Sequence, residues 1–86
     1  MPTISIFYGM VIQMYWLDHD PPHFHVRYGG EQAVISIESG ELTRGALPSR
    51  ALKLVQEWTA LHRTELLEDW KLCQTKQTPK PIEPLK

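Results

Sequence analysis

The chain has very little cysteine, no long apolar run and almost no net charge. Cys73 is the only cysteine, so no disulfide forms within the chain, which favours a reducing cytoplasm. No apolar run is long enough to cross a membrane, and the first residues lack the pattern of a secretory signal peptide. We therefore expect a cytoplasmic protein that does not use a membrane as a partner.

The charge balance limits the partners further. Nine Lys and Arg residues oppose ten Asp and Glu residues, which gives a formal net charge of −1. The strongly basic footprint of a duplex DNA-binding protein is absent, so only RNA contact at a local patch stays open. The sequence also lacks a nucleophile elbow, a phosphate-binding glycine loop and a paired-cysteine zinc pattern. No standard motif therefore identifies an activity.

The 86 residues suffice for one small domain, and 42% of them are apolar. Alternating runs come first and a helical pattern follows. This order predicts an α+β fold, an antiparallel meander of four or five strands packed on one long C-terminal helix. We assign residues 1–77 to this domain and 78–86 to a proline-containing C-terminal arm. Ile82 and Leu85 of the arm would dock on the body or on a partner.

Two β-rich runs, 3–8 and 10–16, meet at Gly9. A three-residue loop sets Ile6 opposite Ile12, whereas a two-residue loop spoils the apolar match, so we expect the longer loop. The buried face would then hold Ile4, Ile6, Ile12, Met14 and Trp16. The uncovered face would carry an apolar patch of Phe7, Val11 and Tyr15, suited to a partner protein or to self-association.

The second hairpin has a stronger signal. Gly29-Gly30 fits a two-residue primed turn, and the resulting register matches Phe24 with Ile35 on the apolar face. The opposite face would receive His23 beside Ser36, His25 beside Val34, and Arg27 beside Gln32. A short last strand, Glu41–Arg44, would set Leu42 against Ile37.

One helix is predicted from Pro48, in its first turn, to about Gln74. Its apolar side at 3.6 residues per turn comprises Ala51, Leu52, Leu54, Val55, Trp58, Leu61, His62, Leu66, Trp70 and Cys73. His23 and His25 should face away from this helix. We therefore expect His62 to be a separate, buried side chain that bonds to a backbone carbonyl.

The stretch Asp18–Tyr28 concentrates the reactive side chains, with three of the four histidines, two carboxylates and an arginine. His23 and His25 point the same way on a strand. With His19 from the preceding proline-containing loop they could bind a metal such as zinc, and Asp18 or Asp20 could replace His19. Alternatively, His23 and His25 act as acid and base of a ribonuclease, with Arg27 neutralising a phosphate.

A third interpretation assigns this region to the binding of a partner protein, and a fourth makes the histidines ordinary half-exposed strand residues that bond to neighbouring groups. The residues expected to contact a partner are Tyr15, Asp18, His19, Asp20, Ser36 and Glu38.

Several segments resemble a small bacterial family catalogued as a domain of unknown function, number 4160. They are Met1-Pro2-Thr3-Ile4-Ser5, the stretch Asp18–Tyr28, Leu47-Pro48 with Arg50-Ala51-Leu52, Trp58 with Leu61-His62-Arg63, Glu65-Leu66, and Ile82-Glu83-Pro84-Leu85. The resemblance implies a short cytoplasmic prokaryotic protein, often encoded beside another small uncharacterised protein. It provides no catalytic residues. A regulatory component of a toxin–antitoxin-like module, acting by binding a small partner protein or itself, is therefore our leading hypothesis.

Overall fold

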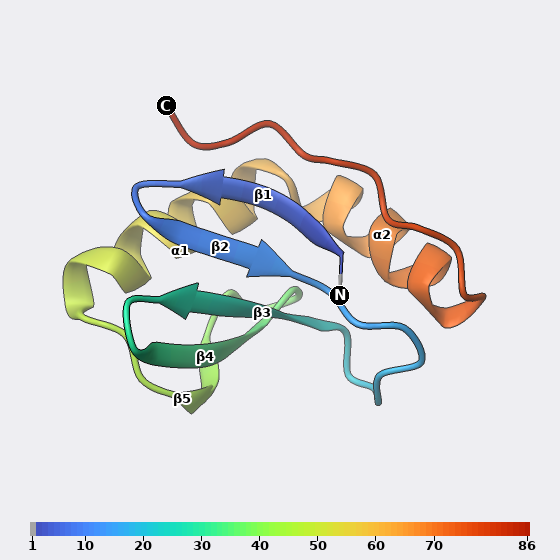
Figure 1. Ribbon diagram of the computed structural model, residues 1–86, viewed down its shortest axis with the longest axis horizontal. Helices are drawn as coiled ribbons and strands as arrows, with labels where there is room; N and C mark the ends of the chain where they lie inside the picture. The colour runs from blue at the N-terminus through green and yellow to red at the C-terminus, as the bar shows by residue number, and fades with distance from the viewer. Residues whose placement is uncertain (1) are drawn as a thin grey trace.

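The computed structural model describes residues 2–86. Within that range, a five-stranded antiparallel sheet packs against two C-terminal helices (Figure 1). The strands follow one another across the sheet in chain order, as a meander. Their bounds are β1 Thr3–Phe7, β2 Met10–Gln13, β3 His23–Tyr28, β4 Glu31–Ser36 and β5 Leu42–Gly45, and the helices are α1 Ser49–Leu61 and α2 Arg63–Gln74. The predicted α+β meander is confirmed, whereas the predicted single long helix is two helices, α1 and α2.

The hairpin of β3 and β4 has the predicted register. Phe24 pairs with Ile35, and His25 pairs with Val34. The turn residue Gly29 takes a φ of +58°, a conformation that costs glycine little. Because side chains alternate along a strand, Phe24 and Ile35 are buried under the helices while His25 is on the open face of the sheet.

The first hairpin differs from the prediction. Its turn has two residues, so that Phe7 pairs with Met10, and a β-bulge at Ile4 inserts an extra residue between two consecutive pairs. Phe7 is consequently buried, with its ring centroid 5.1 Å from that of Trp58. Ile6 is instead 60% exposed. The predicted burial of Ile6 was wrong because the two-residue turn puts Phe7 on the core face and Ile6 on the other face. The bulge then returns Ile4 to the core.

Trp16, which we also expected in the core, is 48% exposed. It lies beyond the end of β2, where the alternation no longer applies, and its indole N–H donates to the carbonyl of Gln77.

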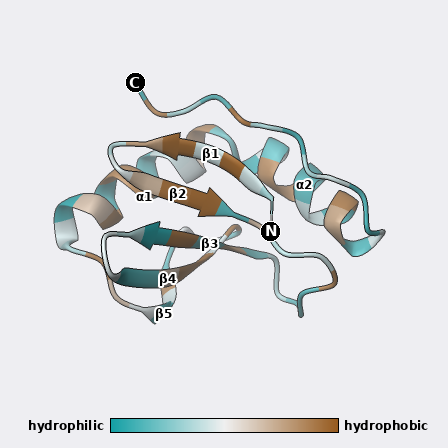
Figure 2. Cartoon of the chain, in the orientation of Figure 1, coloured by the Kyte–Doolittle hydropathy of each residue, from teal (hydrophilic) through white to brown (hydrophobic). Residues whose placement is uncertain are grey.

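The apolar residues of β1 and β2 appear as the brown segments of Figure 2.

The predicted register of β5 was also wrong. Leu42 pairs with Ile35 rather than with Ile37, and after an irregularity Arg44 pairs with Val34. Gly45 ends the strand with a φ of +76°.

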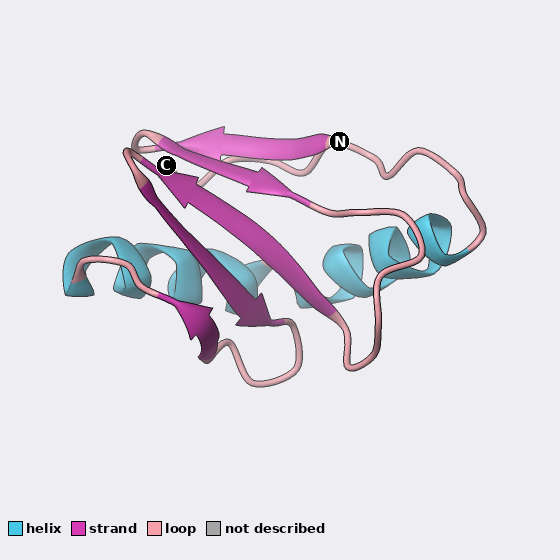
Figure 3. Ribbon diagram, turned by 60° about the horizontal axis from the view of Figure 1, so that its bottom comes forward, coloured by secondary structure: helices cyan, strands magenta, loops and turns pink. Residues whose placement is uncertain are grey.

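The C-terminal helical region bends at His62, where φ is −122° and ψ is 23°. A straight helix over residues 48–74 would measure roughly 40 Å at about 1.5 Å per residue, longer than the 33 Å greatest extent of the domain. The bend lets α1 pack under the sheet while α2 continues to the side of the β2–β3 loop (Figure 3). Pro48 occupies the N-cap position directly before α1, not the first turn where we expected it.

His62 is partly exposed rather than buried. Its Nδ1 lies 2.6 Å from the Glu65 carboxylate, so the expected backbone carbonyl is not its partner. That carboxylate lies one helical turn further along the chain, in α2. Leu61, which we also placed on the apolar side, is exposed at the end of α1 because the helical path breaks directly after it.

The C-terminal tail lies along β1 and the helices (Figure 1). The Ile82 N–H donates to the Ile4 carbonyl at 2.8 Å, and the Trp58 indole donates to the Glu83 carbonyl at 2.8 Å. The Asp69 carboxylate accepts the Lys80 N–H, and burial raises the pKa of Asp69. Ile82 is buried, so the tail contributes to the core.

No helix within residues 2–86 has the length and apolar character required to cross a membrane.

Gly45 provides a test of the β4–β5 register. A Cβ at this position would collide with the Gln32 carbonyl oxygen, and its φ is in the left-handed region. We expect Gly45→Ala to lower the free energy of unfolding by about 1–3 kcal/mol in urea titrations. Gly30→Ala is the control, since no atom lies within 4 Å of the position that its methyl group would take. Equal midpoints for the two variants would contradict this register.

Candidate functional site

The β2–β3 loop is held by the end of α2. The Leu17 N–H donates to the Cys73 carbonyl at 3.2 Å, and the Gln74 side-chain amide donates to the Asp18 carbonyl at 3.0 Å. These bonds link residues that are far apart in the chain and fix the position of Asp18. Cys73 is buried, which raises the pKa of its thiol to about 11. It therefore does not supply a thiolate at neutral pH.

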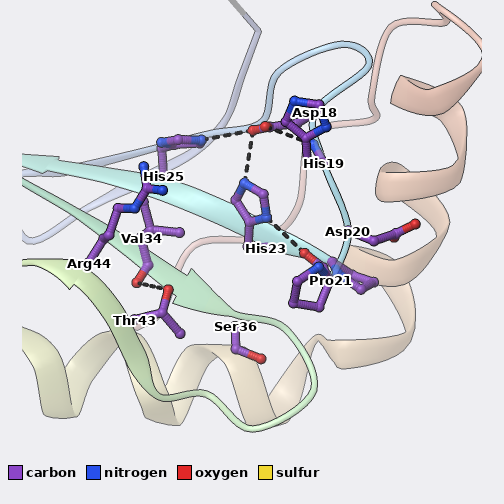
Figure 4. Close-up of a pocket in the computed structure, with 11 residues that line it drawn as sticks. Asp18, His19, Asp20, Pro21, His23, His25, Val34, Ser36, Thr43 and Arg44 are labelled. Atoms are coloured by element: carbon purple, nitrogen blue, oxygen red, sulfur yellow. Dashed lines mark hydrogen bonds and ion pairs between the residues drawn. The ribbon is translucent and has the colours of Figure 1, made fainter.

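Asp18, His23 and His25 form one cluster (Figure 4). A single carboxylate oxygen, Oδ2 of Asp18, lies 2.8 Å from Nε2 of His23 and 3.1 Å from Nε2 of His25. The two rings come from alternate positions of β3 and therefore share a face. All three side chains are only 15–23% exposed.

The ring of His23 has a defined orientation. Its Nδ1 lies 2.8 Å from the Pro21 carbonyl oxygen, which can only accept, so Nδ1 carries a proton. In the neutral ring Nε2 then presents a lone pair, and it faces an oxygen of the Asp18 carboxylate. Two acceptors at this separation require either a proton between them, carried by the ring or by the carboxyl group, or a metal ion bound to both.

The ionised form of Asp18 is favoured by its neighbours. Burial acts to raise the pKa of this carboxyl, but its hydrogen-bonding contacts with the His25 ring, the His19 backbone N–H and the His23 ring outweigh burial and lower the pKa. Asp18 therefore carries a negative charge at neutral pH. A cluster of one carboxylate and two imidazoles suits a divalent transition metal.

Aromatic rings fix the two histidines in place. Tyr15 stacks on His25 at 4.1 Å and 16°, and Trp70 of α2 contacts His23 with ring centroids 5.1 Å apart. We expected both histidines to face away from the helical layer. Both are on the open face of the sheet, and the ring of His23 also contacts the helical layer because α2 continues past the sheet toward the loop (Figure 3).

The cluster opens onto a cavity of about 370 Å³, within the range of small-molecule sites. The walls come from the proline-containing loop, from β3 and β4, and from β5. The lining residues are Asp18, His19, Asp20, Pro21, Pro22, His23, His25, Val34, Ser36, Thr43 and Arg44.

Of the residues predicted to carry function, Asp18, His19, Asp20, His23, His25 and Ser36 line this cavity. His19 is exposed, and its ring nitrogens are not among the three ligand atoms that lie within 4.8 Å of one another. Asp18 is therefore the third residue of the candidate metal site, a role that we first gave to His19. Tyr15 supports His25 without lining the cavity, and Glu38 is exposed in the turn after β4.

Arg27 is on the open sheet face, opposite Gln32, and does not line the cavity. The arginine that does so is Arg44, which the sequence interpretation missed. The predicted pairing of Leu42 with Ile37 would have put Arg44 opposite Ile35, on the core face. A shift of one residue moves a side chain to the other face, and the irregularity between the pairs of Ile35 and Val34 causes this shift.

Comparison with protein families identifies one match, a domain of unknown function, DUF4160, over residues 9–71. The chain belongs to this family. The matched segment contains the whole cluster, the residues that line the cavity and most of both helices, so the candidate site lies within the part of the chain that the family model covers. No curated protein and no solved structure matches the chain.

The tautomer of His23 can be measured directly. Because the Pro21 carbonyl accepts from Nδ1, we expect Nδ1 to be protonated with or without metal, as seen in long-range ¹H–¹⁵N spectra at about pH 7.5. His62, whose Nδ1 faces Glu65, provides an internal comparison. A neutral His23 ring protonated only at Nε2 would contradict this assignment.

Proposed function

We propose that this DUF4160 domain binds a divalent transition metal ion, with Zn²⁺ as the first choice. Its ligands would be Asp18 Oδ2, His23 Nε2 and His25 Nε2. The observation that carries the proposal is the contact of His23 Nε2 with the Asp18 carboxylate, while Nδ1 of the same ring donates to the Pro21 carbonyl. A metal ligand histidine typically has this second hydrogen bond on its other nitrogen.

The spacing of the three atoms supports the proposal. Ligands of a tetrahedral zinc ion are roughly 3.3 Å apart for metal bonds of about 2.0–2.1 Å. The oxygen–nitrogen separations of 2.8 and 3.1 Å are somewhat shorter than this value, and all three atoms lie within 4.8 Å of one another. Three protein ligands leave a coordination position for water or a substrate, as in catalytic zinc sites. Here that position would face the cavity.

The geometry favours a metal over a metal-free ribonuclease with two histidines. In acid–base catalysis one ring takes a proton and another gives one, each within reach of its own reacting oxygen. His23 and His25 instead converge on one oxygen of Asp18, with ring centroids 5.3 Å apart, so both Nε2 atoms share the same partner. Arg27 also lies outside the cavity.

Metal content of purified variants tests the proposal. We expect one zinc per wild-type chain after loading and dialysis. Asp18→Ala and the double variant His23→Gln/His25→Gln should each lose most of it, because each removes ligand atoms. His19→Gln, which changes a cavity residue outside the ligand set, is the control and should keep its zinc.

Circular dichroism would show that the variants remain folded. Absence of zinc from the wild type, or retention by folded Asp18→Ala protein, would overturn the assignment.

A second candidate function is the binding of a small partner protein in a toxin–antitoxin-like regulatory module. The open sheet face supports it. Ile6 is 60% exposed there beside Val11, and two arginines, Arg27 and Arg44, lie on the same face. Glu31, the acidic residue of β4, has its side chain on the other face of the sheet, because side chains alternate along a strand. These properties suit a partner with an apolar centre and acidic surroundings.

Co-expression with the product of the adjacent gene tests the second candidate. We expect a stoichiometric complex that Ile6→Lys disrupts, since this change places a charge in the apolar part of the face. Leu61→Lys is the matched control, because Leu61 is 66% exposed on α1. Equal complex formation by both variants would contradict an interface on the sheet, and sedimentation of the chain alone would reveal self-association.

A further inference from the structure

We propose that the cavity binds the phosphate group of a phosphate ester, with Arg44 as its anion-binding residue. The inference rests on the proposed metal site and gives that site a class of ligand. The inference is based on the position of Arg44. This residue lies next to the cluster, although its strand, β5, is distant from the cluster in the sequence.

Two strand pairings place Arg44 near His25 of the cluster. It is opposite Val34, which is opposite His25. Its side chain lies beside His25 in the close-up view of the cavity (Figure 4). Among residues 2–86, no carboxylate forms an ion pair with Arg44. The guanidinium therefore keeps its hydrogen-bond donors for a ligand.

The donors around the cavity suit a group with several oxygens. A guanidinium binds two oxygens of a phosphate in parallel. An open metal position would take another, and the Ser36 hydroxyl, which also lines the cavity, is a further donor. A carboxylate has only two oxygens and would leave part of this set without a partner.

The charges make the binding depend on the metal. Two acidic residues, Asp18 and Asp20, and one arginine, Arg44, line the cavity, so the formal charge of its lining is negative. A divalent ion on the cluster makes the lining positive. Anions should therefore bind to the metal-loaded protein and not to the metal-free protein.

The surface continues beyond the phosphate position. A second hollow of about 280 Å³ shares His25, Val34 and Arg44 with the first. Arg44 thus borders both hollows. A phosphate held at Arg44 could belong to a small ester in one hollow or to an oligonucleotide backbone that extends across both.

Titration calorimetry on zinc-loaded protein tests the inference with phenyl phosphate and a short single-stranded RNA, and with acetate as the carboxylate control at constant ionic strength. We expect both phosphate ligands to bind and acetate to bind much more weakly. Arg44→Gln should weaken phosphate binding by about tenfold or more, as expected for loss of a charged hydrogen-bonding pair. Arg44→Lys should have an intermediate effect, since it keeps the charge but not the paired donors.

Arg27→Gln is the matched control, because it removes an exposed arginine of the same sheet face that does not line the cavity. We expect it to bind phenyl phosphate like the wild type. If the RNA binds more tightly than phenyl phosphate and this binding depends on Arg44, the phosphate belongs to a polynucleotide. If the two ligands bind equally tightly, the phosphate belongs to a small ester.

Zinc content is measured in the same samples, so that the two proposals can fail separately. Normal zinc with unchanged phosphate binding in Arg44→Gln would overturn the phosphate site alone. So would equal binding of acetate and phenyl phosphate, or a loss with Arg27→Gln that matches the loss with Arg44→Gln. A wild-type chain that takes up no zinc would overturn both proposals.

Discussion

The shared carboxylate of Asp18 is the interaction on which the site depends. One oxygen faces the ring nitrogens of both His23 and His25, while the Pro21 carbonyl fixes the proton on the far side of His23. Without Asp18, two imidazoles would lie side by side with nothing to hold their Nε2 atoms together. With it, three ligand atoms converge at the wall of a cavity, which is the arrangement that a divalent metal needs.

The rest of the fold supports this arrangement from outside. The loop that carries Asp18 would be free to move if it were attached only to β2 and β3. Bonds to Cys73 and Gln74 at the end of α2 prevent that, and Trp70 packs against His23. The bend at His62 is what directs α2 to this place. A domain of this size thereby places a preorganised cluster on its open face while its core lies on the helical side of the sheet.

The accuracy of the sequence interpretation followed the strength of the local signals. In the β3–β4 hairpin the turn residues and the apolar alternation agree, so every pair was predicted. In the first hairpin, apolar alternation favoured a three-residue loop because it cannot indicate the bulge that keeps Ile4 buried with a two-residue turn. At β5, an irregularity likewise changes the register by one residue. That is why Phe7 was assigned to the open face and Arg44 to no site. The helical periodicity predicted helix on both sides of His62, but periodicity does not reveal a bend.

The sequence by itself determined the α+β class, the register of the central hairpin and the common face of His23 and His25, because each follows from local alternation and turn chemistry. It also indicated the stretch in which a site would lie. Only the tertiary structure decided that Asp18 rather than His19 completes the cluster, and that Arg44 rather than Arg27 adjoins it. Both choices depend on contacts between segments distant in the chain, through the loop bonds to α2 and the bulge between β4 and β5. Such contacts leave no periodic trace in the sequence.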